Sequence, residues 1–346
     1  MKILSPISRL EEVDILKDSG AEWFYCGVTP REWIDRFTPG IWLNRRGPLG
    51  GNLRSIEELA ELVKRAHSYG IGVSLTLNAP YYTENQIPFV RKLAREAITK
   101  IGVDALIIAD VGLITALKDL RRGVDIHISS LGNCYNIETA RFYKELGAKK
   151  ITFSRHMNIN EIETIVREVK EIEFEVFILN DGCVFEEGFC HAPHSVDSRL
   201  EVFCLADWEY RLSYRNNGKS LDLNDRESWK GHLSDYQKWQ WYMNNCGCSM
   251  SINKVPNGPC GLCAIYDFFK IGISSLKIVG RESSTLRKAA SVRLVSEIVN
   301  MVRVGTSKHE MIEKAKRLRG NPELCNSGYM CYYRNVNSEV NLTSVQ

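Results

Sequence analysis

The chain has 346 residues, of which 44% are hydrophobic and 25% charged, and its formal net charge is +3. This length suffices for one large domain or two small ones, and the composition excludes a globally disordered protein. The small net charge gives no electrostatic case for nucleic-acid binding beyond a local patch for RNA. No apolar run reaches the ~20 residues that span a bilayer, and no secretory signal pattern is present, so we expect a cytoplasmic protein.

Short apolar segments alternate with amphipathic helical segments along most of the chain. Two capping-box patterns, Ser55–Glu58 and Thr83–Gln86, mark helix starts after the second and third strands. This alternation predicts a parallel sheet with right-handed crossovers. Eight such units favour a closed (β/α)8 barrel, and an open doubly wound sheet is the alternative. The expected strands are Lys2–Ser5, Glu22–Gly27, Gly72–Leu77, Ala105–Ala109, Asp125–Ser129, Lys150–Ser154, Phe174–Leu179 and Ser275–Val279.

The alternation breaks between the seventh and eighth strands. Residues 181–262 are too long for an ordinary connection, are rich in aromatic side chains and hold six of the eleven cysteines. We interpret them as a functional elaboration on the active face of the barrel. The predicted organisation is one barrel domain over residues 1–320, with this insertion, and a polar C-terminal tail over residues 321–346.

Eleven cysteines are many for a protein expected in a reducing compartment, where disulfides are uncommon. Metal ligation, redox chemistry and buried packing remain as explanations. Thiolates suit either iron in a cluster or zinc, and spacing alone does not decide between them. Cys183 directly follows the seventh strand, at the carboxyl end where barrel enzymes place their chemistry.

The stretch from Glu175 to Cys190 resembles the signature of the peptidase U32 family. The residues that fit the spacing of this signature are Glu175, Phe177, Cys183, Gly188 and Cys190. The signature's Gly, His and Ser are replaced here by Asn180, Leu179 and Pro193. Similar segments follow at Ser154-Arg155 with residues 159–162, at Cys204 with Trp208-Glu209-Tyr210, and from Cys263 through Leu276–Arg281, where Val279 replaces the usual Glu.

The resemblance implies a [4Fe–4S] cluster on the four matching cysteines, Cys183, Cys190, Cys204 and Cys263. It also implies oxygen-independent hydroxylation of a small molecule or of RNA, with prephenate as oxygen donor, in anaerobic metabolism. Zinc is the alternative metal. The second-choice ligands are Cys260 for Cys263, and Cys246 and Cys248 for Cys204; no role is predicted for Cys325 and Cys331.

The resemblance leaves two alternative functions. Some family members act as heterodimers, so the chain is alternatively a non-catalytic, cluster-bearing partner subunit. Other members are collagenase-like peptidases. Peptidase activity is disfavoured. A metallopeptidase would need a motif such as H-E-x-x-H, and none is present. A cysteine peptidase would need a histidine placed against its thiolate, and the closeness of His191 and His194 to Cys190 in sequence does not establish that geometry.

Polar side chains at strand ends complete the candidate site. Arg155 can bind a carboxylate bidentately, or form a structural salt bridge. Lys277 points into the predicted barrel, where its burial demands a partner, and Glu175 is the expected one. Arg281 and Asp181, just past strands, are the further catalytic candidates. Weaker candidates, more simply explained as caps, turns or packing residues, are Cys26, Asn78, Asp110, His127, Ser129, His156 and Asn180.

Overall fold

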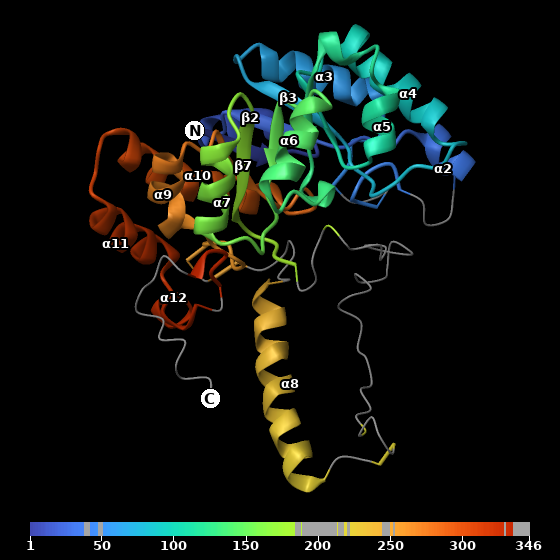
Figure 1. Cartoon of the computed structure of the whole chain (residues 1–346). Coiled ribbons are helices and arrows are strands. Elements are labelled where there is room, and N and C mark those ends of the chain that lie inside the picture. Colours follow the sequence, from blue (N-terminus) through green and yellow to red (C-terminus); the bar gives the residue numbers. More distant parts are fainter. Residues whose placement is uncertain are drawn as a thin grey trace.

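Eight parallel strands close into a barrel in which each strand pairs with its neighbours in sequence and β8 pairs with β1 (Figure 1). The computed structural model describes residues 1–37, 42–47, 51–183, 188, 213, 218–219, 222–243, 250–251, 253–328 and 330–334. The strands are β1 (Lys2–Pro6), β2 (Trp23–Cys26), β3 (Gly72–Leu77), β4 (Ala105–Ile108), β5 (Asp125–Ile128), β6 (Lys150–Thr152), β7 (Glu173–Leu179) and β8 (Ser275–Ile278). The predicted barrel is therefore confirmed, and the open-sheet alternative is wrong.

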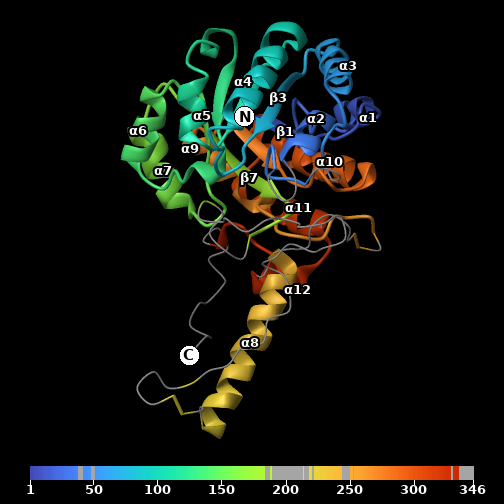
Figure 2. The ribbon, with the colours of Figure 1, turned by 90° about the vertical axis from the view of Figure 1, so that its right-hand side faces the viewer.

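Helices surround the barrel and cover its outer face (Figures 1 and 2). They are α1 (Glu12–Asp18), α2 (Arg31–Phe37), α3 (Ile56–His67), α4 (Ile87–Glu96), α5 (Val111–Ala116), α6 (Ile137–Glu145), α7 (Ile159–Glu168), α8 (Leu223–Met243), α9 (Ile265–Ile271), α10 (Thr285–Arg303), α11 (Lys308–Arg319) and α12 (Pro322–Ser327). In both views α8, from the insertion, extends away from the barrel. Among the described helices, none is both long enough and apolar enough to cross a bilayer.

The predicted capping residues lie at the starts of α3, which precedes β3, and of α4, which follows β3. The Ser55 side chain accepts a hydrogen bond from the Glu58 amide, as a helix N-cap does. The Glu58 carboxylate accepts from the Arg54 amide, one residue earlier than a reciprocal capping box requires. Before α4, the Gln86 side chain accepts from the Thr83 amide at 2.9 Å. The Glu58 amide is one of the groups that a helix start leaves without a partner. The predicted capping box at Thr83 is wrong in its position, because α4 begins at Ile87 and its N-cap residue, Gln86, makes no side-chain cap hydrogen bond.

The hydrophobic core fills the space between the strands and the inner faces of the helices. Every residue of β3 and β4 is buried, which is typical of parallel strands covered on both faces. A buried ion pair joins α1 to α10, where the last barrel helix meets the first. Lys288 Nζ lies 2.9 Å from Glu12 Oε2. The tail also reaches the core, since Tyr332 and Tyr333 are buried within it.

A polar cluster occupies the barrel interior. Lys277 Nζ lies 2.9 Å from Glu175 Oε1, with both side chains buried, so the expected pairing is confirmed. Hydroxyl groups of Thr152 and Ser275 also donate to the Glu175 carboxylate. Burial alone raises the pKa of Glu175, but the ammonium groups of Lys277 and Lys150 outweigh it and lower the pKa to about 2.

His127 also lies in this interior, where burial and the charge of Lys150 lower its pKa to about 3. The imidazole is therefore neutral at physiological pH. A buried neutral histidine matches the simpler of its two interpretations, a core residue.

Replacing Glu175 by Gln leaves the buried ammonium of Lys277 without its counter-charge. We expect a loss of about 3–5 kcal/mol in the free energy of unfolding at pH 7, measured by urea denaturation. Adding Lys277→Met to Glu175→Gln recovers part of that loss, because the orphaned charge is removed.

The matched control is Arg31→Ala. Its ion pair with Asp35 has side chains 82% and 56% exposed, so we expect a change of at most about 1 kcal/mol.

The stabilisation by the Glu175–Lys277 pair depends on pH. It is complete above the unfolded carboxyl pKa of about 4.3 and is lost as the pH falls toward 2, the folded pKa of Glu175. The difference between wild type and Glu175→Gln must therefore shrink over that pH range, and a constant difference contradicts the assignment.

Candidate functional site

Arginine side chains from separate segments gather around Asp181 at the carboxyl ends of the strands. Arg46 Nη2 lies 3.2 Å from Asp181 Oδ2, and Arg287 Nη1 lies 3.8 Å from Oδ1. The main-chain carbonyl of Asp181 accepts hydrogen bonds from Arg155 Nε at 2.9 Å and from the Tyr332 hydroxyl at 2.7 Å. Carboxyl ends of parallel strands meet at one face of a barrel, which explains how these distant residues converge.

Asp181 is the centre of this cluster and is buried, with its side chain 4% exposed. Its Oδ1 accepts no hydrogen bond from the residues that the structure describes. A buried carboxylate oxygen without a hydrogen bond is costly, and such atoms frequently mark places that a ligand completes. Asp181 can therefore accept a proton or a hydrogen bond from a substrate placed among the arginines.

Arg155 is held in one orientation at the end of β6. Its guanidinium lies over the Phe177 ring, 3.7 Å from the centroid, while its Nε donates to the Asp181 carbonyl. This arrangement fixes the planar group, and a fixed guanidinium binds carboxylates bidentately at a lower entropic cost. The predicted position of Arg155 at this face is confirmed, and its catalytic role stays a prediction.

Arg281 is buried below the carboxyl face of the barrel and bonds to protein side chains. Its guanidinium is buried and donates to the side-chain oxygens of Thr76, Asn52 and Asn44 at 3.0, 3.1 and 3.0 Å. Burial lowers its pKa to about 10, so it remains charged at neutral pH. The contacts make it a link between β3 and the loop before α3, which positions Arg46.

The weaker candidates mostly serve local structure. Asp110 caps α5 by accepting from the Gly112 and Leu113 amides. Asn78 donates to Ser129 Oγ at 3.2 Å. Cys26 is buried in the core, and burial raises its thiol pKa to about 12. The simpler interpretation of these residues therefore agrees with their contacts.

Asn180 replaces the signature's glycine without changing the backbone. Its φ is +71°, in the left-handed region that glycine occupies freely and asparagine tolerates. Its amide also donates to the Val279 carbonyl and to Ser291 Oγ. The departure from the signature therefore preserves the turn that follows β7 and adds links to β8 and α10.

Arg46 is a functional candidate that the sequence reasoning missed. It belongs to the Arg45-Arg46-Gly47 run in the long connection between β2 and α3, and it also pairs with Glu282 at 3.3 Å. The sequence contains one signal for Arg46: two consecutive arginines lie in a connection that leaves the carboxyl end of a barrel strand.

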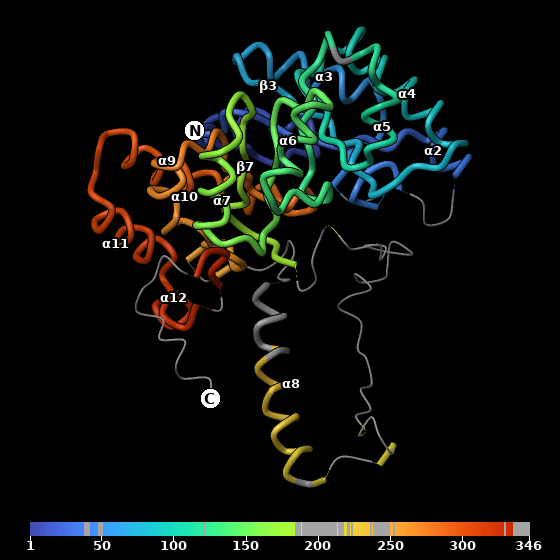
Figure 3. Tube along the Cα trace, in the orientation of Figure 1, coloured from blue at the N-terminus to red at the C-terminus, as the bar shows by residue number. Residues whose placement is uncertain are grey.

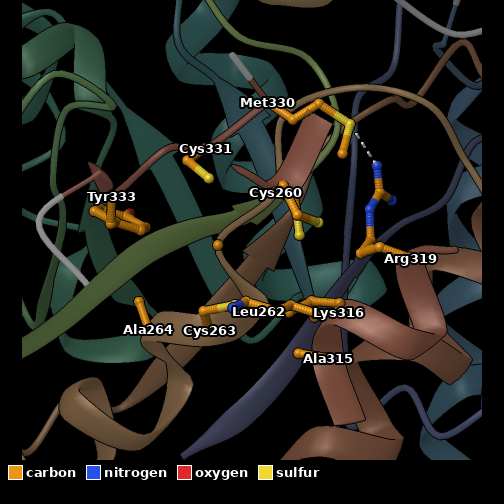
Figure 4. Close-up of a pocket in the computed structure, with 12 residues that line it drawn as sticks. Cys260, Leu262, Cys263, Ala264, Ala315, Lys316, Arg319, Met330, Cys331 and Tyr333 are labelled. Atoms are coloured by element: carbon orange, nitrogen blue, oxygen red, sulfur yellow. Dashed lines mark hydrogen bonds between the residues drawn. The ribbon is translucent and has the colours of Figure 1, made fainter. Parts of the chain in front are cut away.

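The four cysteines implied as cluster ligands are only partly described. Cys190 and Cys204 lie outside the described residues, as do the second choices Cys246 and Cys248. Cys183 is half-buried just past β7. Soft thiolates suit an iron–sulfur cluster, so the donor type fits. Cys263, however, lies in a pocket lined by three other thiols, those of Cys260, Cys325 and Cys331 (Figure 4).

The comparisons with known proteins agree with the resemblance. A family model described as peptidase family U32 matches residues 8–339. The chain is 29% identical to the tRNA hydroxylation protein P of Escherichia coli over 65% of this chain and 46% of the relative. It is 30% identical to the 23S rRNA 5-hydroxycytidine C2501 synthase of the same organism, over 52% of this chain and 29% of the relative.

A third relative is a collagenase of Porphyromonas gingivalis. It is 24% identical over 65% of this chain and 53% of the relative. The matched regions thus span about half or less of these three curated relatives.

Substitutions at Asn180 test the left-handed turn. Asn180→Gly loses two hydrogen bonds, each contributing about 1 kcal/mol, but keeps the backbone geometry. Asn180→Val loses the same bonds and forces a β-branched residue into the left-handed region, at a further cost of about 1–2 kcal/mol. We expect urea denaturation to rank wild type above Gly and Gly above Val. A valine variant as stable as the glycine variant contradicts the strained turn.

Proposed function

We propose that this chain, which belongs to peptidase family U32, hydroxylates a base in RNA without using molecular oxygen. The arginine cluster around Asp181 is the observation that carries the proposal. Relatives named for tRNA hydroxylation and for 5-hydroxycytidine synthesis in rRNA support the reaction type and the RNA substrate. The match covers less than half of each of these two relatives.

The arginines suit an anionic oxygen donor. Prephenate, the donor that the resemblance implies, carries two carboxylates, and guanidinium groups bind carboxylates through paired charge-assisted hydrogen bonds. Arg155 is pre-oriented by Phe177, and Arg46 reaches the same region from another loop. Two arginines from different loops therefore allow two carboxylates to be bound at once.

Asp181 supplies the acceptor beside these cations. Its Oδ1 is buried and accepts no hydrogen bond within the described part of the chain, so a substrate hydroxyl donating there satisfies it. The guanidinium groups of Arg46 and Arg287 lie 3.2 and 3.8 Å from its two oxygens. In this proposal Asp181 accepts a hydrogen bond from the donor's hydroxyl group and so orients it.

The proposed cofactor is the [4Fe–4S] cluster that the resemblance places on Cys183, Cys190, Cys204 and Cys263. When bound, such a cluster would supply one-electron chemistry. Cys183 lies two residues after Asp181, so this ligand and the arginine cluster share the turn after β7.

One observation favours a second function, the partner subunit of a heterodimer. Val279 stands where the family usually has Glu, and its side chain is buried past the end of β8. An apolar side chain cannot transfer a proton, so a catalytic carboxylate at this position has to come from another chain. Activity of this chain on its own argues against that alternative.

The direct test is anaerobic incubation of the purified chain with bulk tRNA and rRNA and with prephenate. We expect nucleosides heavier by one oxygen in mass spectrometry of the RNA digest. Arg155→Lys and Arg46→Lys each lose one charge-assisted hydrogen bond of about 1.5–3 kcal/mol, so the rate should fall about 10- to 100-fold.

Arg31→Lys is the matched control, because Arg31 is 82% exposed on α2 and should leave the rate unchanged. A product that forms only with molecular oxygen, or equally without prephenate, contradicts the proposed chemistry. A chain that cleaves collagen peptides but leaves RNA unmodified favours the activity of the collagenase relative instead.

A further inference from the structure

Tail residues 330–334 lie against the turn that follows β7. Helices α11 and α12 follow one another to this end of the barrel, and this segment comes after them (Figure 3). The Cys260 amide donates to the Met330 carbonyl at 2.6 Å, and the Tyr332 amide donates to the Cys260 carbonyl at 3.1 Å. Cys260 also forms a bridge with Leu179, the last residue of β7. The backbone thereby places Tyr332 beside the end of this strand.

A second anchor of the tail comes from α11. The Arg319 guanidinium donates to the Pro256 and Gly258 carbonyls at 2.6 and 3.2 Å. It also lies 3.2 Å from Met330 Sδ, as Figure 4 shows. Several contacts besides the Tyr332 hydroxyl therefore hold the tail against the barrel.

The Tyr332 hydroxyl reaches the main chain at the centre of the arginine cluster. It donates to the Asp181 carbonyl at 2.7 Å and also to the Asn180 carbonyl. Arg155 Nε donates to the same Asp181 carbonyl at 2.9 Å. A carbonyl oxygen has two lone pairs, so these two donors can bond to it at once. A single oxygen atom thus joins the tail to the Arg155 guanidinium.

Asp181 lies beyond the strand ladder that fixes β7. The pairing of β7 with β8 ends at Leu179 and Ile278, two residues before Asp181. Asn180 then turns the chain with a φ of +71°. Because the ladder does not extend to Asp181, the direction of its carbonyl depends on Arg155 and Tyr332 together.

The Tyr332 hydroxyl is in the form that donates a hydrogen bond. Burial raises the pKa of this hydroxyl well above its usual value, and the guanidinium of Arg155 opposes the shift only in part. Tyr332 is therefore protonated and uncharged at neutral pH. It supports the Asp181 carbonyl without adding a charge to the cluster.

We propose that Tyr332 is a positioning residue of the arginine cluster. Its hydroxyl holds the Asp181 carbonyl, and that carbonyl holds Nε of Arg155, whose guanidinium lies over the Phe177 ring. The docked tail thereby fixes the guanidinium before an anionic ligand binds, which lowers the entropic cost of binding. The inference rests on the proposed function for the identity of that ligand, prephenate, and on the contacts above for the positioning itself.

Tyr333, the next residue, shows what a structural tyrosine of the same tail does. Its hydroxyl donates to the Phe177 carbonyl at 2.8 Å, and its ring meets that of Phe268 edge-on at 4.7 Å. Phe177 is already held by its pairing with Lys277 in β8. The two tyrosines are both buried but differ in what the hydroxyl holds, so they form a matched pair.

The test compares Tyr332→Phe with Tyr333→Phe in the full chain purified anaerobically. Each variant removes one buried hydroxyl, so we expect similar losses of stability in urea denaturation. Only Tyr332→Phe should shift the NMR resonance of the Arg155 Nε–H group, because this group bonds to the carbonyl that Tyr332 supports. Arg155→Lys, which lacks the group, assigns the resonance.

Prephenate affinity is the functional measurement. We expect the dissociation constant from calorimetry to rise about 3- to 10-fold in Tyr332→Phe and to change less than about 2-fold in Tyr333→Phe. Equal effects of the two variants on the Arg155 resonance and on the affinity overturn the inference, because they make Tyr332 a packing residue only.

A measurement on the wild type removes the dependence on variant folding. Coupling between two equilibria is reciprocal, so an anion that the docked tail favours must in turn favour docking of the tail. Prephenate should therefore slow hydrogen exchange of the Tyr332 amide, which donates to the Cys260 carbonyl. An unchanged exchange rate at saturating prephenate overturns the inference.

These measurements separate the inference from the proposed function. A wild type that binds no prephenate contradicts the proposed oxygen donor, whereas an Arg155 resonance that only Tyr332→Phe shifts still supports the positioning role. Prephenate binding that is weakened by Tyr332→Phe, in a chain that leaves RNA unmodified, supports the positioning role and contradicts the hydroxylation.

Discussion

The backbone at the end of β7 is the constraint on which the rest of this face depends. Between Phe177 and Asp181 its carbonyl and amide groups bond to the segment before α9, to both tail tyrosines and to Arg155. The Tyr332 hydroxyl also donates to the Asn180 carbonyl. One short stretch therefore sets the position of Asp181, of the thiol pocket and of the docked tail. A left-handed residue at Asn180 makes this possible, because it turns the chain toward both sites.

Buried charges in this barrel are compensated locally and in separate groups. Glu175 and Lys277 neutralise each other inside the barrel, and Glu12 and Lys288 do so between α1 and α10. The arginines around Asp181 differ, because several cations share one carboxylate. Cationic side chains thus gather at this face, in a chain whose formal net charge is only +3. Whole-chain charge is thus a poor guide to what this face attracts.

The strands were predictable from sequence to within two residues, because buried parallel strands are continuous apolar runs bounded by turn residues. The Glu175–Lys277 pair was predictable too, since alternation along β8 turns Lys277 inward. Arg46 was not, because its loop carries no periodic pattern. The gathering of Cys325 and Cys331 with Cys260 depends on tertiary anchoring by Arg319 and the backbone bridge. Cysteine spacing contains no information about such contacts. The cysteines of the family signature are Cys183 and Cys190, and Cys183 does not line this pocket.

The docked tail has a consequence for where the barrel domain ends. A boundary drawn by composition at residue 320 separates α11 from two of the pocket thiols and from the hydroxyl that supports the Asp181 carbonyl. Residues 321–328 and 330–334 are therefore an integral part of the carboxyl face, although they lie outside the repeating strand–helix units. A barrel without these residues would also lack the Tyr332 hydroxyl that supports the Asp181 carbonyl, so the arginine cluster depends on a segment far from it in the sequence.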